Sequence, residues 1–135
     1  EYACRAGTTT VFAFGNKLSS KQANFNGTRP YGGAAVGPRL EQTTSVGSYA
    51  GNPWGFFDMH GNVSEWCADW EGKYPTASLT DPTGPASRSR SHKVIRGASF
   101  VRGAEELRSA KRSHDLLGKR YGSLGFRLSL RQVAK

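Results

Sequence analysis

Two long segments of this chain carry no helical or strand-like spacing of apolar residues, and they limit the fold more than any other feature. Residues 15–48 are rich in Gly, Asn, Thr and Ser, and residues 71–92 form a second such segment around a rigid turn at 81–85. Loops of this length inside a compact domain usually serve a binding role or hold a metal. They leave room only for short elements, so we expect a loop-rich α+β fold with short antiparallel strands.

The remaining segments predict one helix end and several short strands. Residues 1–6 are typical of a helix end, and Gly7 follows as a common C-cap residue. The strand candidates are short segments at 8–14, 46–49, 64–70, 93–100, 107–112 and 124–130. A helical turn over 105–110 is the alternative to the fifth of these strands.

The length of 135 residues fits a single domain, 1–135. Because the chain opens on a helix end, we expect it to be the C-terminal part of a longer chain, and the compartment is unknown. No run approaches the roughly 20 apolar residues of a membrane span, so we expect no membrane insertion by this domain.

The excess of positive over negative charge is confined to the C-terminal part of the chain. Residues 1–85 carry six Lys and Arg against seven Asp and Glu, whereas residues 86–135 carry thirteen against three. Such a basic half can meet nucleic acid, an anionic surface or an acidic protein. The basic residues match no nucleic-acid-binding module, so we expect nucleic acid to be an unlikely partner, and several Arg to be structural.

Three segments combine Gly, aromatic residues and Arg in a fixed order. They are 52–66 (Asn-Pro-Trp-Gly-Phe-Phe-Asp-Met-His-Gly-Asn-Val-Ser-Glu-Trp), 94–100 (Val-Ile-Arg-Gly-Ala-Ser-Phe) and 124–128 (Leu-Gly-Phe-Arg-Leu). Together they resemble the signature of the formylglycine-generating enzyme (sulfatase-modifying factor) family, and the resemblance runs from Glu1 to Arg127. It implies a C-type-lectin-like fold, which in this family serves oxidases and pure binding modules.

Within this pattern, two sets of side chains have structural interpretations. We expect aromatic side chains to supply the apolar core that short strands cannot supply; these are Trp54, Phe57, Trp66 and Trp70. We expect four arginines to be buried or half-buried and to anchor loops through their five hydrogen-bond donors each; these are Arg96, Arg108, Arg112 and Arg127.

The segment 58–65 is a candidate calcium loop, because a hard cation takes six to eight oxygen ligands from an irregular backbone. The resemblance implies side-chain oxygens from Asp58 and Glu65 and backbone carbonyls from Gly61 and Val63. The alternative is that Asp58 or Glu65 pairs with an Arg or caps backbone amides. No other cofactor is indicated.

No catalytic residue is predicted. His60 stands alone in a Gly-rich loop, which is typical of a packed, hydrogen-bonding histidine. Cys4 and Cys67 are the only cysteines, and they match neither a zinc spacing nor a Cys-x-x-Cys motif. Two reduced, partly buried thiols are the favoured interpretation, with a disulfide as the alternative.

The chain departs from the oxidase branch of the family at one place. That branch binds copper through two cysteines that follow the Arg-Gly-Gly-Ser-like strand, because Cu(I) takes soft thiolates. Residues 100–112 contain no cysteine. The ergothioneine-type branch needs three histidines, partly from a further helical domain, and His60, His92 and His114 do not supply them. We therefore expect a binding module and no enzyme.

Residues 94–128 also resemble the variable region of proteins diversified by retroelements, which use this same fold. There, adenines mutate in asparagine codons ending in C, so the products exclude Lys, Glu, Gln, Trp and Met. The positions that fit such codons are Phe100, Val101, Arg102, Gly103, Ser113, His114, Asp115, Leu116, Leu117, Tyr121, Gly122 and Ser123. We expect these residues to form a diversified ligand-binding surface of a bacterial or phage protein, while Lys111 and Lys119 would be fixed or differently encoded.

The resemblance thus predicts a protein ligand, with Phe100 and Tyr121 as aromatic anchors in the manner of an antibody surface. The alternative for Leu116 and Leu117 is packing against the core. Two other functions stay open: an enzyme related to sulfatase maturation, and a calcium-dependent carbohydrate-binding lectin, although the Glu-Pro-Asn and Gln-Pro-Asp sugar signatures are absent.

Overall fold

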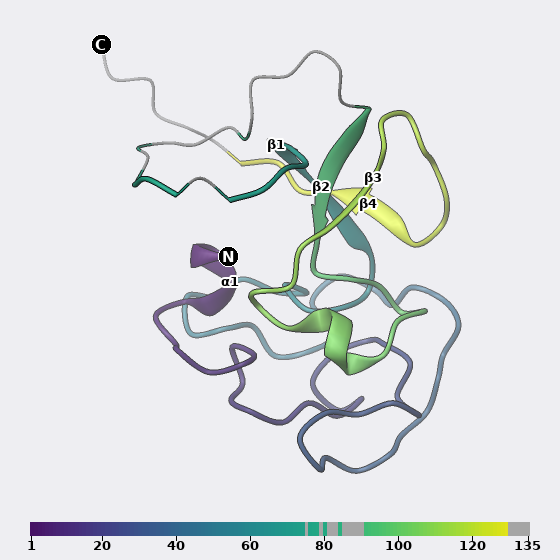
Figure 1. The fold of residues 1–135 in the computed structure, drawn as a ribbon. Coiled ribbons are helices and arrows are strands. Elements are labelled where there is room, and N and C mark those ends of the chain that lie inside the picture. Colours follow the sequence, from purple (N-terminus) through teal and green to yellow (C-terminus); the bar gives the residue numbers. More distant parts are fainter. Residues whose placement is uncertain (75, 79, 81–83, 85–90, 130–135) are drawn as a thin grey trace.

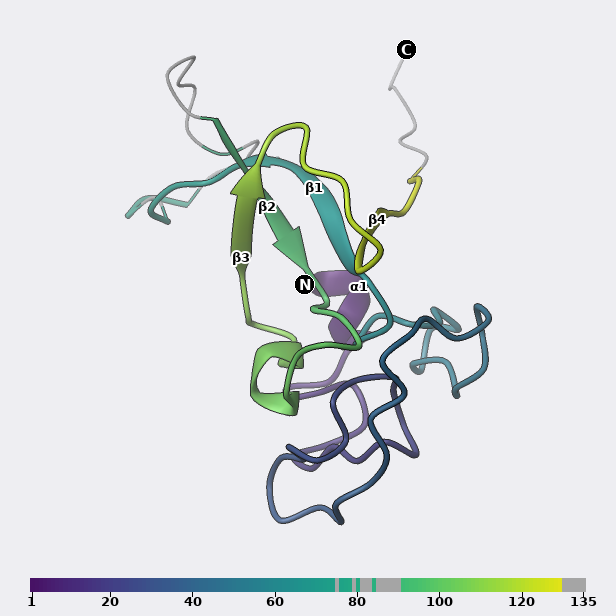
Figure 2. The same ribbon diagram turned by 90° about the vertical axis from the view of Figure 1, so that its right-hand side faces the viewer.

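The computed structural model describes residues 1–74, 76–78, 80, 84 and 91–129. A small sheet occupies one end of the molecule, and irregular chain from the first half of the sequence fills the other end (Figures 1 and 2). The elements in chain order are α1 (Tyr2–Arg5), β1 (Ser64–Trp70), β2 (His92–Arg96), the 3-10 helix η1 (Ala104–Leu107), β3 (Ser113–Leu116) and β4 (Leu124–Phe126). The turn predicted at 81–85 lies outside the described residues apart from Gly84.

The sheet is mixed, with strand order β3-β2-β1-β4. β2 pairs antiparallel with both β1 and β3, whereas β4 runs parallel to β1. The strand predicted at 93–100 ends early, at Arg96, because Gly97 and Ala98 adopt left-handed backbone conformations with φ of 82° and 56°. Among the described residues, no helix is long and apolar enough to cross a membrane.

Three predicted strands are wrong. Residues 8–14 form only an isolated bridge between Phe12 and Gly15, because local partners such as the Asn16 side chain, bonded to the Val11 amide, take the backbone groups that a strand would need. Residues 46–49 form turns. The chain at 107–112 is the end of η1 followed by a turn, which makes the helical alternative the better one, and the strand comes later, as β3.

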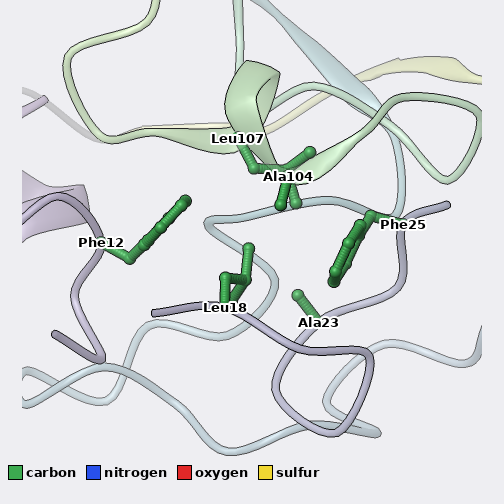
Figure 3. Close-up of a cluster of buried hydrophobic side chains, with 6 residues drawn as sticks. All are labelled: Phe12, Leu18, Ala23, Phe25, Ala104 and Leu107. Atoms are coloured by element: carbon green, nitrogen blue, oxygen red, sulfur yellow. The ribbon is translucent and has the colours of Figure 1, made fainter. Parts of the chain in front are cut away.

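The hydrophobic core lies below the sheet, between the N-terminal loops and η1 (Figure 3). It consists of Phe12, Leu18, Ala23, Phe25, Ala104 and Leu107. The expected aromatic core is wrong in part: Trp54 and Phe57 are each 45% exposed, and Trp66 and Trp70 are half-buried. A four-stranded sheet of such short strands cannot cover these rings, so the N-terminal loops supply the core.

Buried asparagine side chains hold the long loops in place. The Asn62 side-chain oxygen accepts hydrogen bonds from the Thr44 amide at 3.0 Å and from Asn24 Nδ2 at 3.2 Å. Asn24 Nδ2 also donates to the Gln42 carbonyl at 2.9 Å. These amide groups give the backbone of the 15–48 loop the partners that a strand ladder would otherwise supply, so this loop is ordered although its sequence has no periodicity.

Candidate binding site

The order of the strands forces the chain between β3 and β4 across the sheet. These strands occupy opposite edges, and residues 117–123 pass over β2 and β1 to connect them (Figure 2). The predicted ligand-binding positions therefore gather on three neighbouring segments: the connection at 100–103, the edge strand β3, and the crossing at 117–123. Tight turns hold the crossing, with the Lys119 amide donating to the Leu116 carbonyl at 3.2 Å.

Seven of the predicted positions line one cavity of about 270 Å³. They are Val101, Arg102, Ser113, His114, Asp115, Tyr121 and Ser123. The rest of the wall comes from the segment 95–99 together with Ser64, Glu106 and Lys111. The sequence analysis did not select this second set. A sequence pattern could have identified part of this second set, since the motif Arg-Gly-Ala-Ser at 96–99 directly precedes the first predicted position.

The other predicted positions lie outside this cavity. Leu116 and Leu117 are 40% and 63% exposed, so they do not pack in the core, and Gly122 is exposed as well. Phe100 is half-buried, with its amide bonded to a backbone carbonyl of the loop beneath. Gly103 is buried and so lies outside the expected exposed surface: it packs against Arg29 and the Glu105 carboxylate, and a Cβ atom there would displace that carboxylate, which ends a flexible side chain.

One side-chain contact fixes the shape of the cavity mouth. The Tyr121 hydroxyl donates a hydrogen bond to Asp115 Oδ2, which links the crossing segment to β3. This bond lowers the pKa of Asp115 and raises the pKa of Tyr121, since it stabilises the charged carboxylate and the neutral phenol. The tyrosine ring thus stands at the mouth in one orientation.

Two of the predicted arginine anchors fasten the frame around the cavity. Arg96 Nη1 donates to the carbonyls of Ser109 and Lys111, both at 3.1 Å, which ties β2 to the chain leading into β3. Arg112 Nη1 donates to the Gly72 carbonyl at 2.9 Å. Because each guanidinium satisfies loop carbonyls, these arginines are structural.

Arg127 is a third anchor, and Arg108 is a weaker one. The Arg127 guanidinium contacts both Glu65 oxygens, at 3.0 Å and 2.7 Å, and also donates to the Phe57 carbonyl at 3.0 Å. Glu65 raises the pKa of Arg127. Arg108 is exposed and donates to a single carbonyl three residues earlier.

The geometry of the loop at 58–65 favours the alternatives to a calcium site. Its predicted ligands are Asp58, Gly61, Val63 and Glu65. Asp58 Oδ2 accepts the Gly47 amide at 2.8 Å, and Glu65 faces the Arg127 guanidinium. Within the described part of the chain, no three His, Cys, Asp or Glu side chains gather in a position to hold a metal ion. This arrangement fits calcium only if Arg127 leaves Glu65, so the calcium site stays a prediction.

His60 is buried and fully bonded, as the sequence analysis expected. The Ala13 amide donates to Nε2 at 3.1 Å, so Nδ1 carries the proton and donates to the Leu107 carbonyl at 2.7 Å. Burial lowers the pKa of His60.

Cys4 is buried beside the His60 ring, Cys67 is half-buried, and neither forms a disulfide. Burial raises the pKa of both thiols, which keeps them protonated.

A short mixed sheet, a sparse helix content and long ordered loops define an α+β, C-type-lectin-like domain. Residues 1–132 match the Sulfatase-modifying factor enzyme 1-like domain. The chain belongs to this family, as the resemblance of its motifs predicted.

Among curated relatives, the chain is similar to the serine/threonine-protein kinase pkn1 of Chlamydia caviae, with 32% identity over 92% of this chain and 18% of that protein. It is 33% identical to the formylglycine-generating enzyme of Streptomyces coelicolor over 94% of this chain and 43% of the enzyme. The chain therefore spans less than half of each of these relatives.

Two solved structures share the fold. The Treponema denticola variable protein 1 superposes with a TM-score of 0.75 and 27% identity, over 93% of this chain and 42% of that chain. PvdO from Pseudomonas aeruginosa superposes with a TM-score of 0.74 and 29% identity, over 93% of this chain and 47% of that chain.

Proposed function

We propose that this chain is a non-catalytic binding module, which presents a diversified surface at 100–123 to a protein ligand. In this account it is a variable protein of a diversity-generating retroelement. The scaffold that the arginine and asparagine side chains fasten stays constant, and the side chains around the cavity change from copy to copy. Gly103 belongs to the scaffold in this proposal, because it is buried and a side chain there would displace the Glu105 carboxylate.

The observation that carries the proposal is the gathering of predicted positions around one cavity. Those positions were selected from the family resemblance and from codon chemistry, and they come from three segments that the fold brings together. The exposed Val101, Leu117 and Tyr121 side chains add apolar surface that folding does not explain. The likeness to the Treponema denticola variable protein 1 supports the same assignment.

The competing function is that of a formylglycine-generating enzyme, which several relatives are called. Copper chemistry in that branch uses two thiolates after the strand that corresponds to β2. Here the segment 100–112 has none, and Cys4 is buried with a raised pKa. The residues present do not fit a copper site of that kind, so we derive no oxidation step from this chain.

A paired library selection tests the proposal. One displayed library randomises the predicted positions other than Gly103, and a matched library randomises the same number of exposed positions between 33 and 46. Both are selected against hen egg-white lysozyme. We expect folded, specific binders from the first library and none from the second. Equal yields from both libraries, or loss of folding in the first, would contradict the proposal.

A turnover assay tests the competing function separately. The protein is incubated with Cu(I), oxygen and a peptide that carries the sulfatase Cys-x-Pro-x-Arg sequence, and aldehyde formation is followed by mass spectrometry. We expect no product above the background of copper alone. Multiple turnovers would make the chain an enzyme and overturn the argument from the absent cysteines.

A further inference from the structure

A second recess, an open groove, lies beside the variable cavity. It is bounded by β1, β2, β4 and the crossing at 117–121, and its volume of about 780 Å³ falls in the roughly 300–1,000 Å³ range of ligand sites. Tyr121 lines both the groove and the cavity, so one aromatic ring separates them. The two recesses are therefore neighbouring subsites of one face.

The floor of the groove is apolar. Trp66 and Cys67 from β1 and Leu124 from β4 are half-buried there, while Phe126 and Leu117 at its margins are 72% and 63% exposed. An exposed aromatic and an exposed aliphatic side chain over an apolar floor form a surface that water solvates poorly. An apolar anchor from a partner would bury this surface on binding.

The rim of the groove is positively charged. Lys93, Lys119 and Arg120 surround it, and no Asp or Glu is among the described residues that line it. Lys93 is held over the Trp70 ring at 4.0 Å. Lys119 and Arg120 form no ion pair within the described part of the chain, so both charges face solvent.

We propose that this groove binds an acidic peptide segment of a partner protein, with an aromatic or large aliphatic side chain seated on the floor between flanking carboxylates on the rim. Charge complementarity identifies the flanks, because Lys119 and Arg120 face solvent and no Asp or Glu is among the described residues that line the groove, whereas the Lys93 ammonium is engaged by the Ala68 carbonyl and the Trp70 ring. The half-buried apolar floor indicates that the side chain seated on it is aromatic or large and aliphatic.

Single-stranded nucleic acid also combines negative charge with rings that stack. It needs a continuous basic track along its backbone, and here the neighbouring cations are used internally. Arg96 and Arg112 donate to loop carbonyls, and Arg127 pairs with Glu65. Among the described residues that line the groove, Lys119 and Arg120 keep solvent-facing charges, and this short basic stretch suits a short acidic peptide.

Most residues that line the groove are outside the predicted variable set, since only Leu117 and Tyr121 among them belong to that set. If the proposed diversification holds, this subsite stays constant while the cavity beside it changes. The acidic segment would then be recognised by every copy of the protein. This constancy rests on the proposed function, whereas peptide binding by this chain does not.

A fluorescent peptide, Asp-Glu-Trp-Glu-Asp, tests the groove by anisotropy. We expect saturable binding to the full chain, and a loss of about tenfold or more in affinity for a probe with Ala in place of Trp. A probe with Lys and Arg in place of the acids should not bind. Equal binding of the three probes, or none by the acidic tryptophan probe, would overturn the proposal.

Two matched charge-reversal variants localise the effect. The double variant Lys119→Glu/Arg120→Glu should weaken binding of the acidic probe at least tenfold. The control Lys17→Glu/Lys21→Glu lowers the net charge equally at two exposed positions in the N-terminal loops, and it should change affinity less than twofold. An equal loss in both variants would reduce the effect to net charge and overturn the site.

Two further comparisons complete the test. Phe126→Ala removes an exposed ring and should weaken binding without loss of folding. A dT decamer that binds more tightly than the acidic probe would reassign the groove to nucleic acid. The peptide result does not depend on the library selection, so failure of one leaves the other intact.

Discussion

Replacement of Asn62 provides a quantitative test of how side chains hold the loops. Its side-chain amide accepts hydrogen bonds from the Thr44 amide at 3.0 Å and from Asn24 Nδ2 at 3.2 Å and donates one to the Thr44 carbonyl at 3.3 Å, and the Thr44 hydroxyl is a weaker fourth partner at 3.5 Å. At about 0.5–1.5 kcal/mol each, these bonds contribute about 2–4 kcal/mol to the free energy of unfolding. Asn62 also has a φ of 62°, in the left-handed region.

Two substitutions separate these contributions. Asn62→Gly removes the hydrogen bonds but adopts the left-handed backbone freely, so we expect a loss of about 2–4 kcal/mol. Asn62→Ala adds the cost of a left-handed alanine, about 1 kcal/mol more. The Asn62 carbonyl accepts the Phe100 amide at 3.0 Å, so displacement of this residue also disturbs the first variable position.

Urea denaturation monitored by tryptophan fluorescence measures both losses. The control is Asn26→Ala, whose side-chain bonds reach only Thr28, two residues away; it should cost about 1 kcal/mol or less. If Asn62→Gly costs no more than the control, the buried amides do not order the loops. If the glycine and alanine variants are equally stable, the backbone part of the argument is wrong.

Three further predictions follow from the same structure. Because burial lowers the pKa of His60, this residue takes up a proton more readily in the unfolded chain than in the folded one. The stability that the neutral His60 contributes should therefore be complete above about pH 6.5 and decrease below it. Urea titrations at several pH values should show that His60→Gln makes the free energy of unfolding depend less on pH in this range. Leu107→Ala, at a position 1% exposed, should lower the free energy of unfolding by about 2–5 kcal/mol, whereas the exposed control Leu117→Ala should change it by less than about 0.5 kcal/mol. Because Arg127 forms an ion pair with Glu65, millimolar calcium should raise the Tm of the variant Arg127→Ala and leave the Tm of the wild type unchanged. An equal rise in both proteins would show that the arginine does not compete with the ion.

The sequence predicted the fold class and the sheet strands that coincide with family motifs. Residues 64–70 form β1 as expected, β4 falls within its predicted segment, and β2 overlaps its predicted segment but begins one residue earlier, at His92. These motifs specify type and order, so they place strands even where periodicity is weak. The family resemblance, and not hydrophobic patterning, therefore carried the fold prediction.

The location of the core could not be read from composition. Trp54 and Phe57 are large and apolar, yet the short sheet leaves them half-exposed, while Phe12 and Phe25 in loop-like segments are fully buried. Loop burial depends on distant partners such as Asn24 and Asn62, and single-sequence patterns carry no information on such pairs. The strand predicted at 8–14 failed for a different reason, since local partners such as the Asn16 side chain take its backbone groups.

The candidate site was predictable as a set of positions but not as a shape. The family resemblance selected the segments and codon chemistry the positions within them, and only the strand order revealed that 117–123 must cross the sheet from β3 to β4. It also could not separate Gly103, which packs inside, from its exposed neighbours. The basic groove escaped the sequence analysis because its floor and rim come from four separate segments.

Sequencing the codons for residues 94–128 across a population of the source organism tests the central claim most directly. The account predicts substitutions at the eleven predicted positions other than Gly103, with Gly103, Lys119 and Arg120 unchanged, and a near-identical adenine-rich template nearby. A uniform sequence without a template, or substitutions spread evenly over Arg96, Arg112 and the predicted positions alike, would contradict it.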